Sequence, residues 1–211
     1  MLIAEELVLL ALRPDGRLAR HGTQSSVAVG VTGALVAELA IDGHLDLTDG
    51  RIRPTGTRPE HPMLAQALDS TARHSGKKLK SRLGSITRAG WSEVLDGMIA
   101  AGIVGRDTGP LRPTRHPIAD PGAHELLLGE IRAAATGSGP LSPRTATLLA
   151  LAGPCQLLEV VAPERGDRKA ARRRIETAAE RVSAAAAVEA TIEVTQAAVI
   201  AVIAASSVAT T

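Results

Sequence analysis

Positively charged side chains gather in the middle of the chain, just before its only aromatic residue, Trp91. Residues 51–116 contain twelve Lys or Arg and five Asp or Glu, a net charge of +7, whereas the whole chain carries +2. Lys and Arg bind phosphate as point charges or planar forks. This stretch therefore predicts an anionic partner, either phospholipid headgroups or nucleic acid, with a merely solvated polar loop as the alternative. The candidate headgroup-binding residues are Lys77, Lys78, Lys80, Arg82, Arg88 and Trp91.

Motifs for catalysis, metals or cofactors are missing from the sequence. The six histidines are dispersed without metal-ligand spacing, and a single cysteine excludes the Cys-pair patterns of zinc sites. Gly137-Ser138-Gly139 has no predicted strand before it and Pro140 after it, so it does not match a phosphate-binding loop. No Gly-x-Ser-x-Gly elbow is present either. We therefore expect a protein that is not an enzyme and that uses no cofactor.

Two further ionisable sites are expected to be structural. Glu5 and Glu6 are adjacent and point to different faces of a helix, so they cannot share a proton and instead cap or pair. Cys155 has no partner for an internal disulfide, and its neighbours Pro154 and Leu157 predict a buried small residue. An activated thiolate needs an electropositive, partly exposed setting, which this sequence context does not offer.

The composition suits one domain spanning residues 1–211. Hydrophobic residues make up 45% of the chain, but Phe and Tyr are absent, so Leu, Val, Ile and Ala must build the core. The abundance of alanine, and of arginine over lysine, indicates a GC-rich bacterial genome.

The sequence also predicts a cytoplasmic protein. The N-terminus lacks the cationic region of a signal peptide, and Glu5 and Glu6 interrupt its apolar run. The best candidate for a membrane span, between Ala197 and Ala205, is far shorter than the roughly 20 residues that a bilayer requires. Any membrane association is therefore expected to be peripheral, on the inner face of the cell membrane.

The apolar periodicity predicts a mainly α fold. Ser25 or Ser26 is expected to cap one helix, and Ser142-Pro143 to begin another. The expected helices cover residues 2–12, 27–41, 62–74, 79–83, 91–101, 123–135, 144–152, 156–161, 168–182, 184–190 and 191–206. A strand is the alternative at 191–195, where β-branched residues are frequent.

Two short β-hairpins are expected between these helices. The first turns at Asp49-Gly50 and returns through Ile52, and the second turns at Thr108-Gly109. A helix followed by a hairpin thus occurs twice, which is also the layout of winged-helix DNA-binding proteins. However, the corresponding helices would present acidic side chains, which disfavours nucleic-acid binding. These are Glu38, Glu93 and Asp96.

Three runs near the N-terminus carry a family resemblance: Glu5-Glu6-Leu-Val-Leu-Leu-Ala-Leu, Arg13-Pro14-Asp15-Gly16, and Leu35-Val-Ala-Glu-Leu-Ala-Ile-Asp-Gly-His-Leu-Asp-Leu. Their order and spacing resemble the Golgi phosphoprotein 3 (GPP34, Vps74-like) family. Residues 94–104, His116-Pro117 and 197–205 are similar to the family's central helix, hairpin and C-terminal helix. The resemblance therefore spans nearly the whole chain.

This resemblance implies a single helical domain around a central helical bundle. It also implies a non-enzymatic peripheral membrane module that binds phosphatidylinositol 4-phosphate in eukaryotic relatives. The family's lipid pocket uses a Trp, a following Arg and a basic-x-x-Arg pair. Those positions fall here on Thr23, Thr32, Arg88 and Trp91, of which only Arg88 carries the family's residue type.

The family's hairpin, which serves self-association and membrane contact, falls between Ile103 and Pro117. A protein partner or a homo-oligomer is therefore expected there. Our leading prediction is a module that docks on anionic phospholipid membranes. The alternatives are a winged-helix-like DNA-binding protein and a protein–protein scaffold.

Overall fold

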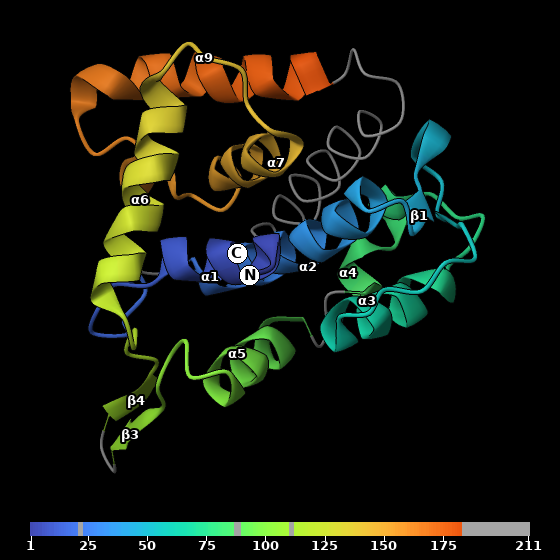
Figure 1. Ribbon diagram of the computed structural model, residues 1–211, viewed down its shortest axis with the longest axis horizontal. Helices are drawn as coiled ribbons and strands as arrows, with labels where there is room; N and C mark the ends of the chain where they lie inside the picture. Colours follow the sequence, from blue (N-terminus) through green and yellow to red (C-terminus); the bar gives the residue numbers. More distant parts are fainter. Residues whose placement is uncertain (21–22, 87–89, 110–111, 183–211) are drawn as a thin grey trace, which may run out of the picture.

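Two apolar helices run through the middle of the molecule in the computed structural model, which describes residues 1–20, 23–86, 90–109 and 112–182. They are α1 (Ile3–Ala11) and α2 (Gln24–Ile41). Three helices pack on one side of this pair (Figure 1): α6 (Pro121–Thr136), α7 (Pro143–Ala152) and α9 (Arg165–Val182). Three lie on the other side: α3 (Pro62–Ala72), α4 (Leu83–Ile86) and α5 (Gly90–Ala100). The predicted mainly α fold is confirmed.

The central position of α1 follows from its composition, because it is apolar on nearly every face. Leu7, Val8 and Leu10 are completely buried, and such an all-round apolar helix requires neighbours on all sides. Within the described ranges, the buried apolar side chains form one connected cluster of aliphatic residues, methionine and Cys155. The burial of Cys155 is thus confirmed.

Helix α2 corrects the expectation that no segment is long and apolar enough to cross a membrane. Its 18 residues satisfy both criteria, and 78% of them are buried inside the protein. It contacts α1, α3, α4, α5 and α7. The apolar composition of α2 is therefore explained by a core position.

Prolines define the starts of three helices. His61, Asp120 and Ser142 each accept a hydrogen bond from a backbone N–H in the first turn, and a proline occupies the next position. Proline suits this position because its missing N–H would have no helical partner there. The predicted start at Ser142-Pro143 is confirmed, with the Ser142 Oγ 3.1 Å from the Thr145 nitrogen.

The start of α2 was predicted wrongly. The cap position belongs to Thr23, not to Ser25 or Ser26. Ser26 lies within the first turn and donates its hydroxyl to the Thr23 carbonyl at 2.9 Å. A serine in a first turn bonds back to a carbonyl as readily as it caps an N–H, so its presence alone does not fix the boundary.

The first hairpin is confirmed. β1 (Leu45–Asp46) pairs with β2 (Arg53–Pro54), and a 3₁₀ turn over Thr48–Gly50 joins them. Asp49 and Gly50 both adopt left-handed backbone conformations, with φ of 59° and 68°.

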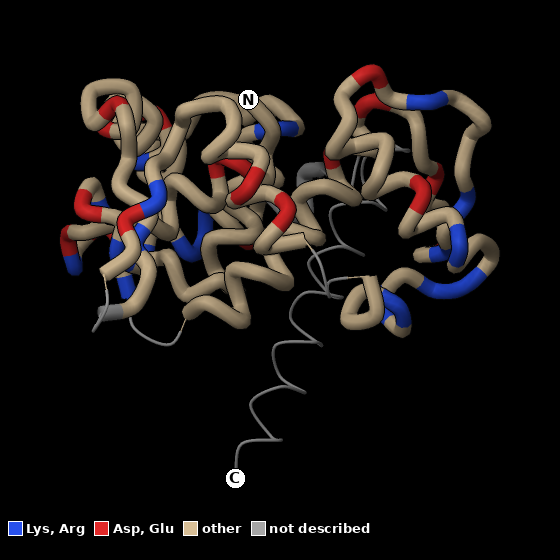
Figure 2. Tube along the Cα trace, turned by 90° about the horizontal axis from the view of Figure 1, so that it is seen from below, with Lys and Arg blue, Asp and Glu red and all other residues tan. Residues whose placement is uncertain are grey.

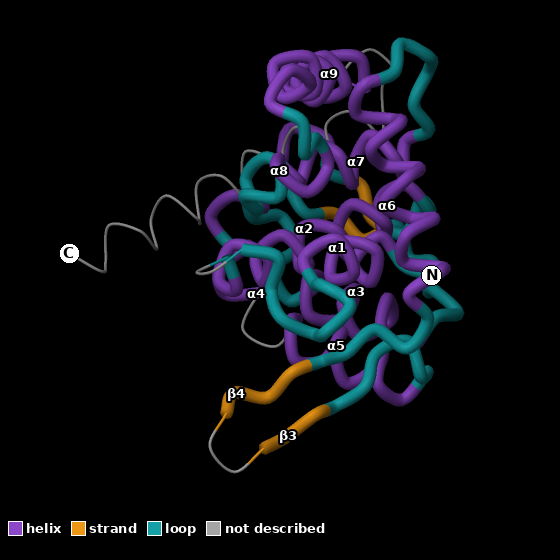
Figure 3. The backbone as a smooth tube through the Cα atoms, turned by 90° about the vertical axis from the view of Figure 1, so that its left-hand side faces the viewer, coloured by secondary structure: helices purple, strands orange, loops and turns teal. Residues whose placement is uncertain are grey.

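The second hairpin exists, but its turn is displaced from Thr108-Gly109. β3 (Asp107–Gly109) pairs with β4 (Arg112–Arg115), so Thr108 and Gly109 lie within a strand. Val104 bridges to Ile118, and both side chains are buried. This apolar pair is in register with the pairing of Asp107 and Arg115. The hairpin extends away from the helices (Figure 3).

The remaining short elements are η2 (Leu79–Ser81) and α8 (Leu158–Val161). They confirm the helical turns predicted near residues 79–83 and 156–161. The predicted helices 184–190 and 191–206, the stretch from Ala197 to Ala205, and Arg88 lie outside the described residues.

Candidate anion-binding site

Four of the predicted basic residues lie together on the 77–82 segment, between α3 and α4. Backbone hydrogen bonds tie this segment to the first hairpin: the Ile52 nitrogen donates to the Lys77 carbonyl at 3.0 Å, and the Gly76 nitrogen donates to the Ile52 carbonyl at 2.8 Å. Leu79 is fully buried and anchors the segment. The charged side chains are exposed, and none of them makes an ion pair with the residues described. They are Lys77, Lys78, Lys80 and Arg82.

The fifth described candidate, Trp91, lies elsewhere. It is half-buried at the start of α5 and lines a cavity of about 440 Å³ that the 77–82 segment does not reach. The segment lies at the β1 end of the molecule, whereas the cavity is bounded by β4 (Figure 1). Lys and Arg residues accordingly appear at both ends of the molecule (Figure 2). The basic middle of the sequence is thus divided in space.

We refer to the space beside Trp91 as the Trp91 cavity. Its polar lining includes Arg13, Arg17, Gln24, Arg115 and His116. Of the family positions named above, Trp91 forms part of its wall, and the buried Thr23 directly precedes Gln24.

A glycine turn brings the arginines of the Trp91 cavity together. The Gly16 nitrogen donates to the Arg13 carbonyl and the Arg13 nitrogen to the Arg17 carbonyl, both at 2.8 Å. Gly16 has a φ of +77°, a conformation that residues with a Cβ rarely adopt. The Gly16 carbonyl also accepts a hydrogen bond from the His116 nitrogen at 3.2 Å, so the turn lies directly against the end of the second hairpin. A Cβ at position 16 would lie 2.4 Å from the His116 carbonyl carbon.

Positive charge exceeds negative charge around the Trp91 cavity. Asp15 pairs with the Arg17 Nε at 3.3 Å, but both side chains are about half exposed, so the pair is weak. In the part of the chain that is described, no carboxylate forms an ion pair with Arg13 or Arg115. Asp107 stands opposite Arg115 in the hairpin register. The arrangement can bind an oxyanion through guanidinium groups.

His116 adds an unpaired polar atom to this wall. Its Nδ1 is buried and has no hydrogen-bond partner among the residues that the structure describes. Buried polar atoms are normally paired, so such an atom beside a cavity is suited to a water molecule or a ligand.

A separate charged cluster joins α1, α2 and α7. Arg144 donates to the Glu38 carboxylate at 2.6 Å and to the Glu6 carboxylate at 3.1 Å. The other Glu38 oxygen accepts the Ile3 nitrogen at 2.9 Å, and Glu5 accepts the Leu2 nitrogen at 2.7 Å. The predicted capping and pairing roles of Glu5 and Glu6 are confirmed.

The electrostatics of this cluster indicate a structural role. Burial raises the pKa of Glu6 above its ordinary value, although the Arg144 guanidinium acts in the opposite direction. Burial disfavours the charged form of Arg144, but its hydrogen bonds to Glu38 and Glu6 outweigh this effect and raise its pKa. Both carboxylates are therefore occupied in holding α1 and α7 to α2.

Cys155 is suited to a structural role rather than to nucleophilic catalysis. Burial raises the pKa of the Cys155 thiol to about 12, which leaves it protonated and a poor nucleophile. Within the described ranges, no group of three or more His, Cys, Asp or Glu residues could hold a metal ion.

Sequence reasoning did not place Arg13, Arg17 and Arg115 among the candidate headgroup-binding residues. The run Arg13-Pro14-Asp15-Gly16-Arg17 shows a turn flanked by two arginines, which was a usable signal. Its contact with residue 116 depends on backbone pairing between segments about a hundred residues apart, and no local pattern reports such pairing.

Comparisons with known proteins agree with the family resemblance. A comparison with curated proteins gave no match. The family model for Golgi phosphoprotein 3 (GPP34) matches residues 3–195, which is most of the chain. The chain therefore belongs to the Golgi phosphoprotein 3 (GPP34) family.

Proposed function

We propose that this chain is a non-enzymatic module that docks on anionic phospholipid membranes through the Trp91 cavity. The observation that carries the proposal is the gathering of Arg13, Arg17 and Arg115 around one cavity that also contains Trp91. Arginine forks bind phosphate in a bidentate manner, and tryptophan favours the interface between headgroups and water. The module works in the cytoplasm, as a peripheral protein on the inner face of the membrane.

In this proposal the Trp91 cavity recognises the negative charge of the membrane surface rather than one particular lipid headgroup. The positions that resemble the family's phosphatidylinositol 4-phosphate pocket carry threonine at 23 and 32, and both side chains are buried. A buried threonine cannot replace the charge of an arginine. We therefore expect phosphatidylinositol 4-phosphate to bind no better than other lipids at equal charge density.

The exposed lysines of the 77–82 segment supply a second, weaker contribution. Each basic residue near an anionic surface adds about 1 kcal/mol to membrane attraction. The segment lies at the other end of the molecule from the second hairpin (Figure 1), so its lysines act at a distance from the Trp91 cavity. The hairpin between Ile103 and Pro117 remains the expected contact for a protein partner or a second copy.

Burial argues against the winged-helix alternative. Helix α2 contacts five other helices and cannot enter a DNA groove. The outward side chains of α5 include Glu93 and Asp96, which phosphate would repel.

Vesicle co-sedimentation tests the proposal. The full chain is mixed with vesicles of phosphatidylcholine alone, or with added phosphatidylglycerol or phosphatidylinositol 4-phosphate at equal charge density. We expect binding to both anionic vesicles, decreasing as salt is raised, and none to the neutral ones. Absence of binding to any anionic vesicle at low salt would reject the proposal. A strong preference for phosphatidylinositol 4-phosphate would reject recognition by charge alone.

A further inference from the structure

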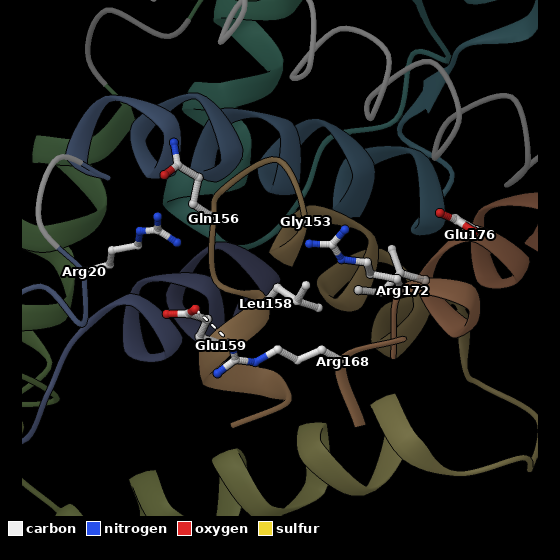
Figure 4. A pocket seen from close by; sticks show the side chains of 9 residues that line it. Arg20, Gly153, Gln156, Leu158, Glu159, Arg168, Arg172 and Glu176 are labelled. Atoms are coloured by element: carbon white, nitrogen blue, oxygen red, sulfur yellow. Dashed lines mark hydrogen bonds and ion pairs between the residues drawn. The ribbon is translucent and has the colours of Figure 1, made fainter. Parts of the chain in front are cut away.

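A second cavity, the Gln156 cavity, lies between the α7–α8 turn and α9 (Figure 4). Its volume is about 460 Å³, within the range typical of small-molecule sites. It shares no lining residue with the Trp91 cavity. The charged and amide groups in its wall are Arg20, Gln156, Glu159, Arg168, Arg172 and Glu176.

One arginine of this cavity is already occupied by the protein. Arg168 pairs with Glu159 at 3.1 Å and donates to the carbonyls of Ala162 at 3.2 Å and Pro163 at 3.0 Å. These contacts neutralise Glu159 and fix the floor of the cavity. Arg168 is therefore a structural element of the wall.

Two other arginines are not occupied in this way. The guanidinium groups of Arg20 and Arg172 extend toward the middle of the cavity from opposite sides (Figure 4). Neither forms an ion pair with a residue that the structure describes. Two unneutralised guanidinium forks that face one space are suited to an oxyanion with several oxygens, such as phosphate.

Gln156 provides an independent observation, because its backbone is in an unfavourable conformation. Its φ is +61°, and it occupies the left-handed position after α7, where the Leu157 nitrogen donates to the Ala152 carbonyl at 2.8 Å. Glycine is the usual residue at this position. The equivalent position after α2 is indeed Gly43, where the His44 nitrogen donates to the Leu39 carbonyl at 2.8 Å. A long amide side chain at such a position costs stability, yet it lines the cavity (Figure 4).

The other lining residues restrict the ligand. Leu158 and Ile175 offer apolar contact to a carbon skeleton. The wall carries three arginines and two glutamates, Glu159 and Glu176, so its net charge is about +1. This small positive charge favours one phosphate group over a polyphosphate.

We propose that the Gln156 cavity binds a small organic phosphate monoester. Arg20 and Arg172 bind the phosphate oxygens from two sides, and the Gln156 amide hydrogen-bonds to a polar group on the carbon skeleton. This site is independent of the membrane-docking cavity.

The test uses isothermal titration calorimetry of the full chain with glycerol 2-phosphate, with inorganic phosphate and glycerol as companion titrations at constant ionic strength. We expect saturable binding of glycerol 2-phosphate, weaker binding of phosphate, and none of glycerol. Arg20→Gln and Arg172→Gln should each weaken glycerol 2-phosphate binding about tenfold or more, since a charge-assisted contact is lost. Lys169→Gln is the matched control, because Lys169 is an exposed cation on α9 outside the cavity.

Gln156→Gly separates binding from folding. We expect this variant to be more stable than the wild type and to bind glycerol 2-phosphate less tightly. The proposal is overturned if the wild type shows no saturable binding of either phosphate probe, or if Lys169→Gln weakens binding as much as Arg172→Gln. It is also overturned if Gln156→Gly binds normally. Vesicle binding should be unchanged in Arg172→Gln, so the failure of one proposal does not imply the failure of the other.

Discussion

The substitution Gly16→Ala tests whether the turn at Gly16 builds the Trp91 cavity. Alanine would have to adopt the φ of +77°, which costs about 1–2 kcal/mol in the left-handed region. Its Cβ would also lie 2.4 Å from both the His116 carbonyl carbon and the Pro117 nitrogen. These are backbone atoms, so no rotation of a side chain can relieve the overlap.

The two chain segments must therefore separate. Separation loses two hydrogen bonds, from the His116 nitrogen to the Gly16 carbonyl and from the Ile118 nitrogen to the Pro14 carbonyl. At about 0.5–1.5 kcal/mol each, they add about 1–3 kcal/mol. We expect a total loss of about 2–5 kcal/mol in the free energy of unfolding, which most domains survive.

Gly43→Ala is the matched control. Gly43 has a nearly identical φ of +75°, but a Cβ there would meet nothing within 4 Å. It should lose only the conformational term of about 1–2 kcal/mol. Urea unfolding followed by the fluorescence of Trp91, the only tryptophan, measures both variants. Equal losses in the two variants would refute the contact between the turn and the hairpin. Gly16→Ala should also weaken vesicle binding, and Gly43→Ala should not.

Three further predictions concern the core. A Cβ on Gly30 would lie 2.3 Å from the Cys155 Sγ, so Gly30→Ala should lower the free energy of unfolding by about 1–3 kcal/mol. The loss should be distinctly smaller in a Cys155→Ala background. Additive losses in a double-mutant cycle would contradict this packing. Because burial raises the pKa of the Cys155 thiol to about 12, iodoacetamide at pH 8 should modify it only after unfolding, and rapid modification of the native protein would show that this burial is wrong. Burial raises the pKa of Glu6 in the folded state above 4.5, so the folded protein binds a proton at Glu6 more readily than the unfolded chain does. The stability that this proton binding provides is lost as the pH rises from 4.5 through the folded-state pKa. The stability of the wild type relative to Glu6→Gln should accordingly fall as pH rises above 4.5, and a rise would contradict the shift.

Local patterns were enough to predict most of the helices. The apolar run of α1 and the Ser142-Pro143 start of α7 carry their structure in a few neighbouring residues. The second hairpin shows the limit of this reasoning. Thr108-Gly109 is a plausible turn, but the buried bridge between Val104 and Ile118 sets a register that places both residues within β3.

The excess of Lys and Arg in residues 51–116 predicted an anionic partner, but it could not show which surface of the folded protein binds that partner. Lys77 and Trp91 are only 14 positions apart, yet the first lies on an exposed segment tied to Ile52 and the second lines a cavity next to Arg115. The pairing of Glu6 and Glu38 with Arg144 likewise joins residues more than a hundred positions apart. Proximity along the chain is a poor guide where long-range packing places the side chains.

The most direct test of membrane docking compares two double variants on the same anionic vesicles. Arg13→Gln with Arg115→Gln removes two cations of the Trp91 cavity, and Lys78→Gln with Lys80→Gln removes two exposed cations of equal total charge from the 77–82 segment. At about 1 kcal/mol for each residue at the docking surface, the arginine pair should weaken vesicle binding by about 30-fold. The lysine pair, which lies away from that surface, should weaken it by only a few-fold. Equal losses would show that overall charge rather than the cavity drives binding, and a larger loss in the lysine pair would place the docking surface on the 77–82 segment.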